Sequence, residues 1–175
     1  GNPKFIDIGS GAGFPGIPIK LAFPNIQLTL VEATRKKADF LKWLITHLGL
    51  RNVDVIAERA ETLAHLKQYR ESFDIATARA IGRIGTVLEL TLPFCSVGGI
   101  VAAHRTSTHP EEIYDAEFAS NNLGGKIRTP ELIQGNPQRN NALIMLVDKI
   151  KPTSQEFPRR DGVPSKRPLK AIDHE

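Results

Sequence analysis

The feature that most constrains this fold is a glycine-rich loop directly after a short apolar strand pattern. Residues 5–8 read Phe-Ile-Asp-Ile, and residues 9–16 contain four glycines before an apolar helical pattern begins. Glycine tolerates positive φ and leaves room for a ligand against the main chain. A helix N-terminus offers unpaired N–H groups and the positive end of its dipole. A strand, a glycine-rich turn and a helix in this order predict a pocket for a nucleotide-type ligand.

Strand and helix patterns alternate along the chain after this loop. We expect strands at 5–8, 27–31, 53–57, 73–78, 100–103 and 142–147, and helices at 17–22, 35–48, 61–66, 86–92 and 110–123. Such alternation with short connections is typical of a parallel sheet covered on both faces. The sequence therefore predicts an α/β fold over residues 1–150.

The last segment, residues 151–175, differs in composition from the rest. It carries four prolines and a group of cations: Arg159, Arg160, Lys166, Arg167 and Lys170. Proline interrupts helices because it lacks an N–H donor. We therefore expect an extended basic tail rather than a further α/β unit.

Size and composition are those of one globular domain. The chain has 175 residues, 41% apolar and 24% charged, and a net charge of +4, which suits an anionic partner such as RNA. A lone cysteine, Cys95, fits a reducing, cytoplasmic setting. No apolar run is long enough to span a bilayer, and no secretory signal opens the chain. The chain begins almost inside its first strand pattern, so we expect an N-terminal segment to be missing from this sequence.

The glycine spacing fits two cofactor patterns. Gly11, Gly13 and Gly16 satisfy the dinucleotide fingerprint, and Gly9, Gly11 and Gly13 satisfy a looser pattern used for S-adenosylmethionine. Glu32 ends the second strand pattern, where a carboxylate accepts hydrogen bonds from ribose hydroxyls. The alternative is that these are plain turn glycines and that Glu32 is a solvated acid.

A second acid, Asp7, lies within the first strand pattern. Acids are rarely buried unless paired. We expect this carboxyl to face the pocket or to accept hydrogen bonds from N–H groups of the loop. Either arrangement orients the loop.

Several further runs occur together with the loop in one known family. They are residues 29–41, residues 48–53, Arg-Ala-Glu at 59–61, Phe-Asp at 73–74 leading to Ala-Arg-Ala at 78–80, and the tail residues 158–169. With the loop, they resemble the bacterial 16S ribosomal RNA guanine-N7 methyltransferases, also called the glucose-inhibited division protein B family. The resemblance covers nearly the whole chain, and the Gly-Phe-Pro-Gly loop is far more specific than glycine spacing alone.

The resemblance implies a Rossmann-like class I methyltransferase fold: a mostly parallel twisted sheet, helices on both faces and an antiparallel last strand. It also implies S-adenosylmethionine as cofactor, 16S rRNA of the small ribosomal subunit as partner, and the assembled particle as the substrate. The cofactor-binding residues carried over by motif position are Gly9, Gly11, Gly13, Phe14, Glu32, Ala33, Thr34, Ala60, Glu61 and Arg79.

The resemblance also assigns these residues to parts of the cofactor. Gly9 and Phe14 line the methionine and ribose side, and Glu32 holds the ribose with Ala33 and Thr34 beside it. Ala60 and Glu61 lie at the adenine, and Arg79 faces the cofactor or the guanine.

Two departures from the family pattern stand out. Members usually carry Ala-Leu-Lys after the fifth strand, whereas this chain has Ala102-Ala103 followed by His104 and Arg105. If that lysine holds RNA, His104 or Arg105 must substitute for it. Members also have a helical N-terminal region, which is absent from this sequence.

The chemistry of guanine N7 sets modest demands on the protein. N7 has a lone pair and no proton, so catalysis needs alignment rather than a general base. Arg79 is expected to hold the guanine O6 or a phosphate, because the end of the fourth strand borders the ligand crevice in open α/β sheets. The alternative for Arg79 is a salt bridge to Glu32, Asp74 or Glu61.

RNA contacts are expected to be mainly ionic. The RNA-binding candidates are His104, Arg105, Arg159, Arg160, Lys166 and Arg167, with Lys170 in the same tail cluster. The alternative is an ordinary solubilising tail. Replacing Arg159 and Arg160 by Ala is expected to weaken RNA binding in a salt-dependent way.

Two other functions compete with this prediction. One is an NAD-dependent oxidoreductase that uses the dinucleotide spacing, and the other is a non-catalytic RNA- or ribosome-binding module that has kept the fold. The histidines lack metal-ligand spacing, so we expect no metal site. We expect the protein to be a monomer.

Overall fold

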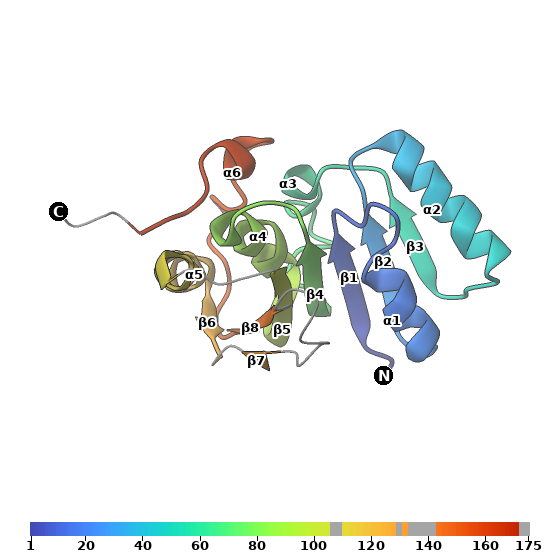
Figure 1. Cartoon of the computed structure of the whole chain (residues 1–175), viewed down its shortest axis with the longest axis horizontal. Coiled ribbons are helices and arrows are strands. Elements are labelled where there is room, and N and C mark those ends of the chain that lie inside the picture. Colours follow the sequence, from blue (N-terminus) through green and yellow to red (C-terminus); the bar gives the residue numbers. More distant parts are fainter. Residues whose placement is uncertain (106–109, 129–130, 133–142, 172–175) are drawn as a thin grey trace, which may run out of the picture.

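The computed structural model describes residues 1–105, 110–128, 131–132 and 143–171 (Figure 1). Its centre is an eight-stranded sheet in the order β3-β2-β1-β4-β5-β8-β6, with β7 also paired to β8. The strands are β1 (Lys4–Ile8), β2 (Gln27–Val31), β3 (Val53–Ile56), β4 (Phe73–Arg79), β5 (Cys95–Arg105), β6 (Gly125–Ile127), β7 (Glu131–Leu132) and β8 (Leu143–Lys149). β1 to β5 pair in parallel, whereas β8 is antiparallel to β5, β6 and β7. The predicted α/β class, with a mostly parallel sheet and an antiparallel last strand, is confirmed.

Helices cover both faces of this sheet (Figure 1). They are α1 (Gly16–Ala22), α2 (Arg35–His47), α3 (Ala60–Leu63), α4 (Ile84–Thr91), α5 (Pro110–Leu123) and a single turn, α6 (Val163–Lys166). Two apolar cores follow from this arrangement. One joins the sheet to α1 and α2, and the other joins it to α3, α4 and α5.

The two-residue period of β1 shows how the faces are assigned. Phe5 belongs to the core with Ile17 and Leu41, from α1 and α2. Ile6 and Ile8 point the other way, into the core with α4 and α5. Successive side chains of a strand face opposite sides of the sheet, so Asp7 lies on the α1 side.

The strand order reverses its direction between β1 and β4. β2 and β3 extend the sheet to one side of β1, and β4, β5 and β8 extend it to the other. In open α/β sheets the ligand crevice lies beyond the carboxyl ends of the strands at such a switch point. The glycine-rich loop follows β1 at this position.

Several details of the fold differ from the elements that the sequence predicts. β5 begins at Cys95 rather than Ile100, α4 begins at Ile84 rather than Thr86, and β6 and β7 were not expected. The apolar side chains of α2 are only partly buried. Phe40 and Trp43 are 44% and 53% exposed, and their rings stack 6.0 Å apart on the outer face of the helix.

The tail contains a helical turn where a wholly extended chain was expected. α6 spans Val163–Lys166 with Pro164 in its first turn, a position where the missing N–H costs no helical hydrogen bond. The tail returns over α3 and α4: Pro164 O accepts a 2.7 Å hydrogen bond from Thr86 Oγ1. A Cβ on Gly85 would lie 1.9 Å from Leu169 O, so α4 and the tail are in direct backbone contact.

A buried lysine anchors the start of the tail. Lys149, at the end of β8, is 1% exposed, and its Nζ donates to Leu92 O at 3.0 Å and to Thr153 Oγ1. Glu71 Oε1 lies 3.2 Å from the same Nζ. Burial lowers the pKa of Lys149, while the nearby Glu71 carboxylate raises it. Because of this cluster, the tail leaves the sheet in a fixed direction.

Candidate cofactor site and basic surface

The glycine-rich loop closes directly onto the end of β2. The N–H groups of Gly9 and Ser10 both donate to Val31 O, at 2.9 and 3.0 Å. The φ angles of Gly9, Gly11 and Gly13 are 69°, 56° and 95°. Glycine adopts such positive values freely, whereas a residue with a side chain would be strained there. A Cβ on Gly9 would also lie 2.6 Å from Ile81 Cγ2, whereas beside Gly11 the nearest heavy atom is 3.8 Å away. The main chain at Gly11 is therefore open to a ligand.

Asp7 fixes the far end of the loop. Its Oδ2 accepts a 3.0 Å hydrogen bond from the N–H of Gly16, the first residue of α1. A Cβ on Gly16 would lie 2.9 Å from that oxygen and 2.6 Å from Leu30 Cδ2. Asp7 is fully buried, and burial raises its pKa to about 7. One of the two roles expected for Asp7, orienting the loop through its N–H groups, is confirmed.

Glu32 joins the loop to the start of α2. Its Oε2 accepts a 3.0 Å hydrogen bond from Gly11 N–H, and its Oε1 accepts a 2.8 Å hydrogen bond from Thr34 N–H. The residue is 6% exposed, next to the exposed Ala33 and Thr34. A carboxylate accepts about four hydrogen bonds, so these two contacts leave acceptor capacity for a diol. The alternative in which Glu32 is a solvated acid is wrong.

Ala60 and Glu61 begin α3, directly beyond β3. Both are buried. Glu61 Oε1 accepts a 2.9 Å hydrogen bond from Gly162 N–H of the tail. The side of the site assigned to adenine is thus tied to the tail, and the adenine contact itself stays a prediction.

Arg79 and Phe14 meet across the site. The guanidinium carbon of Arg79, at the end of β4, lies 6.0 Å from the centre of the Phe14 ring, within the range of a cation–π contact. Both residues are exposed, Phe14 by 54%. Among the described residues, no ion pair joins Arg79 to Glu32, Asp74 or Glu61. Within the part of the chain that the structure describes, the guanidinium of Arg79 therefore contacts Phe14 but is not neutralised by an acid.

His104 and Arg105, which stand in place of the family lysine, are less available for RNA contacts than expected. His104 is paired in register with Arg79, and burial, with the Arg79 charge beside it, lowers its pKa. Both effects favour the neutral form of the imidazole. Arg105 forms an ion pair with Glu112 and donates from Nη1 to Gly82 O at 2.7 Å. Their RNA contacts stay predictions, but neither residue offers a free cation.

The tail arginines divide into two kinds. Arg159 is held by the buried Glu89, with Nε 2.9 Å from Oε1 and Nη2 2.6 Å from Oε2. Arg160, Lys166 and Arg167 are exposed. Replacing Arg159 would therefore disturb the fold as well as the charge, which weakens the paired Arg159 and Arg160 test.

A hollow of about 580 Å³ lies between the tail and the connection from β4 to α4. Its lining is Gly82, Arg83, Ser165, Lys166, Arg167, Pro168 and Lys170. The sequence analysis named the three tail cations but missed Arg83. Its place just beyond the end of β4, four residues after Arg79, is the signal that could have found it.

Within the described ranges, no helix is long and apolar enough to cross a membrane. No group of three or more His, Cys, Asp or Glu side chains there has a geometry able to hold a metal ion.

The sheet order and the glycine-rich loop at its switch point define the Rossmann-like fold of class I methyltransferases. The solved M. jannaschii TYW2 in complex with AdoMet aligns over 83% of this chain and 67% of its own, with a TM-score of 0.64 and 16% identity. At that identity the likeness concerns the fold.

The sequence comparisons identify the family. The chain belongs to the rRNA small subunit methyltransferase G (GidB) family, whose model matches residues 1–140. A relative named ribosomal RNA small subunit methyltransferase G from Dehalococcoides mccartyi (strain CBDB1) is 43% identical over 169 residues, or 97% of this chain and 72% of the relative. One of the same name from Limosilactobacillus reuteri (strain DSM 20016) is 45% identical over 166 residues, covering 93% and 68%.

Proposed function

We propose that this protein transfers the methyl group of S-adenosylmethionine to N7 of a guanine in the 16S rRNA of the small ribosomal subunit. The main observation behind this proposal is that the Glu32 carboxylate accepts hydrogen bonds from the N–H groups of Gly11 and Thr34. The chain that carries it belongs to the rRNA small subunit methyltransferase G family. The family supports the reaction, and Glu32 supports the cofactor. The protein acts in the cytoplasm, where ribosomal subunits are assembled.

The residues at the carboxyl edge of the sheet fit the cofactor. Glu32 has acceptor capacity for the two ribose hydroxyls, and the open main chain at Gly11 admits the ribose and methionine part. Gly9, Gly13 and Phe14 complete that side. Ala33 and Thr34 flank the ribose, and Ala60 and Glu61 border the adenine.

The reaction demands alignment from these residues. When bound, S-adenosylmethionine supplies a methyl group that passes to the N7 lone pair, the C–S bond breaking with its electron pair left on sulfur. N7 bears no proton, so no side chain has to remove one, and catalysis comes from holding the two reactants in line.

In this proposal, Arg79 holds the guanine. Its guanidinium lies over Phe14, beside the loop, and carries several N–H donors in a planar array. The guanine O6 lies next to N7 on the same edge of the base and accepts hydrogen bonds. Arg79 therefore orients N7 by donating to O6, while the Phe14 ring keeps the guanidinium in place.

The deciding experiment is methyl transfer from labelled S-adenosylmethionine to small subunits that lack the modification, followed by mapping of the modified base. We expect label at one guanine N7, with assembled subunits preferred over naked 16S rRNA. Arg79→Ala is expected to lower kcat at saturating cofactor, while Lys67→Ala, far from the site, serves as the matched control.

The outcomes separate the competing functions. Binding of S-adenosylhomocysteine with no label in any RNA would indicate a non-catalytic module. Binding of NAD in place of S-adenosylhomocysteine would indicate an oxidoreductase. Label at another atom would overturn the N7 assignment while leaving the methyltransferase intact.

A further inference from the structure

The hollow beside α6 carries a concentrated positive charge. Four of its seven lining residues are cations, Arg83, Lys166, Arg167 and Lys170, and none is acidic. All four are exposed. Within residues 1–105, 110–128, 131–132 and 143–171, no ion pair involves any of them. Unpaired cations that share a concave surface repel each other, and this repulsion is relieved when an anion binds.

A second hollow continues this basic surface around α6. It has a volume of about 450 Å³ and shares Lys166 and Arg167 with the first, adding Arg160, Asp161 and Val163. Asp161 is the one acid in the second lining. Its carboxylate lies 3.6 Å from Arg59 Nε and accepts a 3.1 Å hydrogen bond from Thr62 Oγ1. The acid is directed toward α3, so it leaves the shared cations uncompensated.

Hydrogen bonds from Arg159 and Arg105 hold the backbone that carries these cations. Arg159 forms an ion pair with the buried Glu89. Its Nη2 also donates a 2.7 Å hydrogen bond to the carbonyl oxygen of Arg167. On the other wall, Gly82 O accepts from Arg105. Rigid presentation lowers the conformational entropy lost on binding. Arg159 thus positions the backbone of Arg167, and Arg105 positions the backbone of Gly82, next to Arg83.

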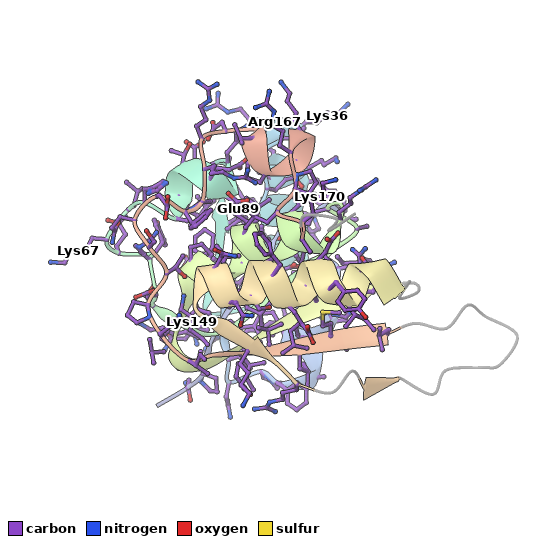
Figure 2. The ribbon with its side chains drawn as sticks, turned by 90° about the vertical axis from the view of Figure 1, so that its left-hand side faces the viewer. Lys36, Lys67, Glu89, Lys149, Arg167 and Lys170 are labelled. Atoms are coloured by element: carbon purple, nitrogen blue, oxygen red, sulfur yellow. The ribbon has the colours of Figure 1, made fainter. Side chains whose placement is uncertain are left out.

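The hollow lies at the same end of the molecule as the cofactor loop. Figure 1 shows α6 at the upper end of the sheet, where β1 and β4 finish and α2 begins. Figure 2 shows Arg167 and Lys36 at that end, while Lys67 projects to one side. Arg83 follows Arg79 by four residues. A strand of RNA that lies along the hollow therefore leads toward Arg79 and Phe14.

We propose that the hollow formed by Arg83, Lys166, Arg167 and Lys170 binds the phosphate backbone of the RNA strand that carries the target guanine. This assignment rests on the proposed function. Phosphate contacts position an RNA without reading its sequence, so the hollow sets register while Arg79 meets the base. It also replaces His104, Arg105 and Arg159 as the main ionic contact.

The test compares two triple variants with the same loss of charge. The groove triple is Arg83→Ala, Lys166→Ala and Lys170→Ala. The control triple is Lys4→Ala, Lys67→Ala and Lys151→Ala, at exposed cations on other parts of the surface. Binding to unmodified small subunits is measured across a salt series, beside S-adenosylhomocysteine affinity and the denaturant midpoint.

We expect the groove triple to weaken subunit binding roughly tenfold or more relative to the control triple. The plot of log K against log salt should also be less steep, its slope smaller in magnitude by about two. Its cofactor affinity and denaturant midpoint should match wild type. A version with Arg83→Lys in place of Arg83→Ala should recover part of the lost binding, because it restores one cation.

Equal subunit binding by the two triples, with equal salt slopes, overturns the proposal. Its failure is distinct from failure of the proposed function. If wild type transfers methyl groups and the groove triple binds normally, the hollow is not the RNA site. If wild type binds subunits through the hollow but transfers no methyl group, the hollow stands and the enzyme assignment falls.

Discussion

The guanidinium of Arg159 reaches through the tail to the carboxylate of Glu89, seventy residues earlier in the chain. Nε lies 2.9 Å from Oε1 and Nη2 lies 2.6 Å from Oε2. The Glu89 side chain is fully buried, whereas that of Arg159 is 29% exposed. A buried carboxylate needs such a partner, so this arginine serves the fold, even though its sequence neighbours suggested a phosphate contact.

Arg159→Ala should therefore lower the free energy of unfolding by about 2 kcal/mol, less than for a wholly buried pair because Arg159 is partly solvated. Arg160→Ala removes the same charge from an exposed side chain and should change it by under about 0.5 kcal/mol. Urea unfolding of both variants measures the difference. Equal stability of the two would show that the Glu89 contact contributes little.

Gly85→Ala should release the tail without unfolding the sheet. The new Cβ would lie 1.9 Å from Leu169 O, and a backbone oxygen cannot move aside as a flexible side chain does. Alanine otherwise favours a helix over glycine by about 1 kcal/mol, so any loss comes from the tail contact. We expect faster trypsin cleavage after Lys166 and Lys170, since Pro168 protects the bond after Arg167. Unchanged cleavage with a raised denaturant midpoint would mean that the tail does not rest on α4.

Glu32→Ala should weaken S-adenosylhomocysteine binding by about a hundredfold, because it removes the ribose acceptor and two charge-assisted hydrogen bonds to backbone N–H groups. Glu32→Gln keeps one acceptor oxygen for the loop and should lose less affinity for S-adenosylhomocysteine. Calorimetric titration of both variants gives the comparison, and the transfer assay should show a raised KM for the cofactor. If Glu32→Ala bound S-adenosylhomocysteine with wild-type affinity, Glu32 would not be a ribose ligand.

The sequence was sufficient to predict the cofactor loop because its signals are local. Glycine spacing, the strand before it and the acid that ends the next strand all lie within the first 32 residues. β6 and β7 were missed because strands this short carry too little period-two pattern to detect. The exposed Phe40 and Trp43 show that a large apolar side chain on a helix need not be buried.

Pairing between distant residues could not be predicted in the same way. Glu89 lies in α4, Arg159 in the tail, and only the folded chain shows that they meet. The same holds for Glu61 with Gly162. Sequence alone ranks cations by local composition, so it grouped the paired Arg159 with the exposed Arg160 and Lys166.

Asp7 should make stability fall as the pH rises toward neutrality. Burial raises its folded pKa to about 7 from the ordinary value of 3.8, so between those two pH values the folded state holds a proton that the unfolded state has lost. Its contribution is therefore present at low pH and is lost as the pH rises through about 7. Asp7→Asn keeps an acceptor for the Gly16 N–H but cannot titrate.

The comparison between wild type and Asp7→Asn isolates this group, because His104, whose lowered pKa acts in the opposite direction, is common to both. From about pH 5.5 to 7.5, wild type should lose about 2 kcal/mol of unfolding free energy relative to Asp7→Asn. Urea unfolding at the two pH values measures it. Parallel changes in the two proteins would mean that Asp7 is already ionised in the folded state at pH 5.5, with the Gly16 hydrogen bond outweighing the cost of burial.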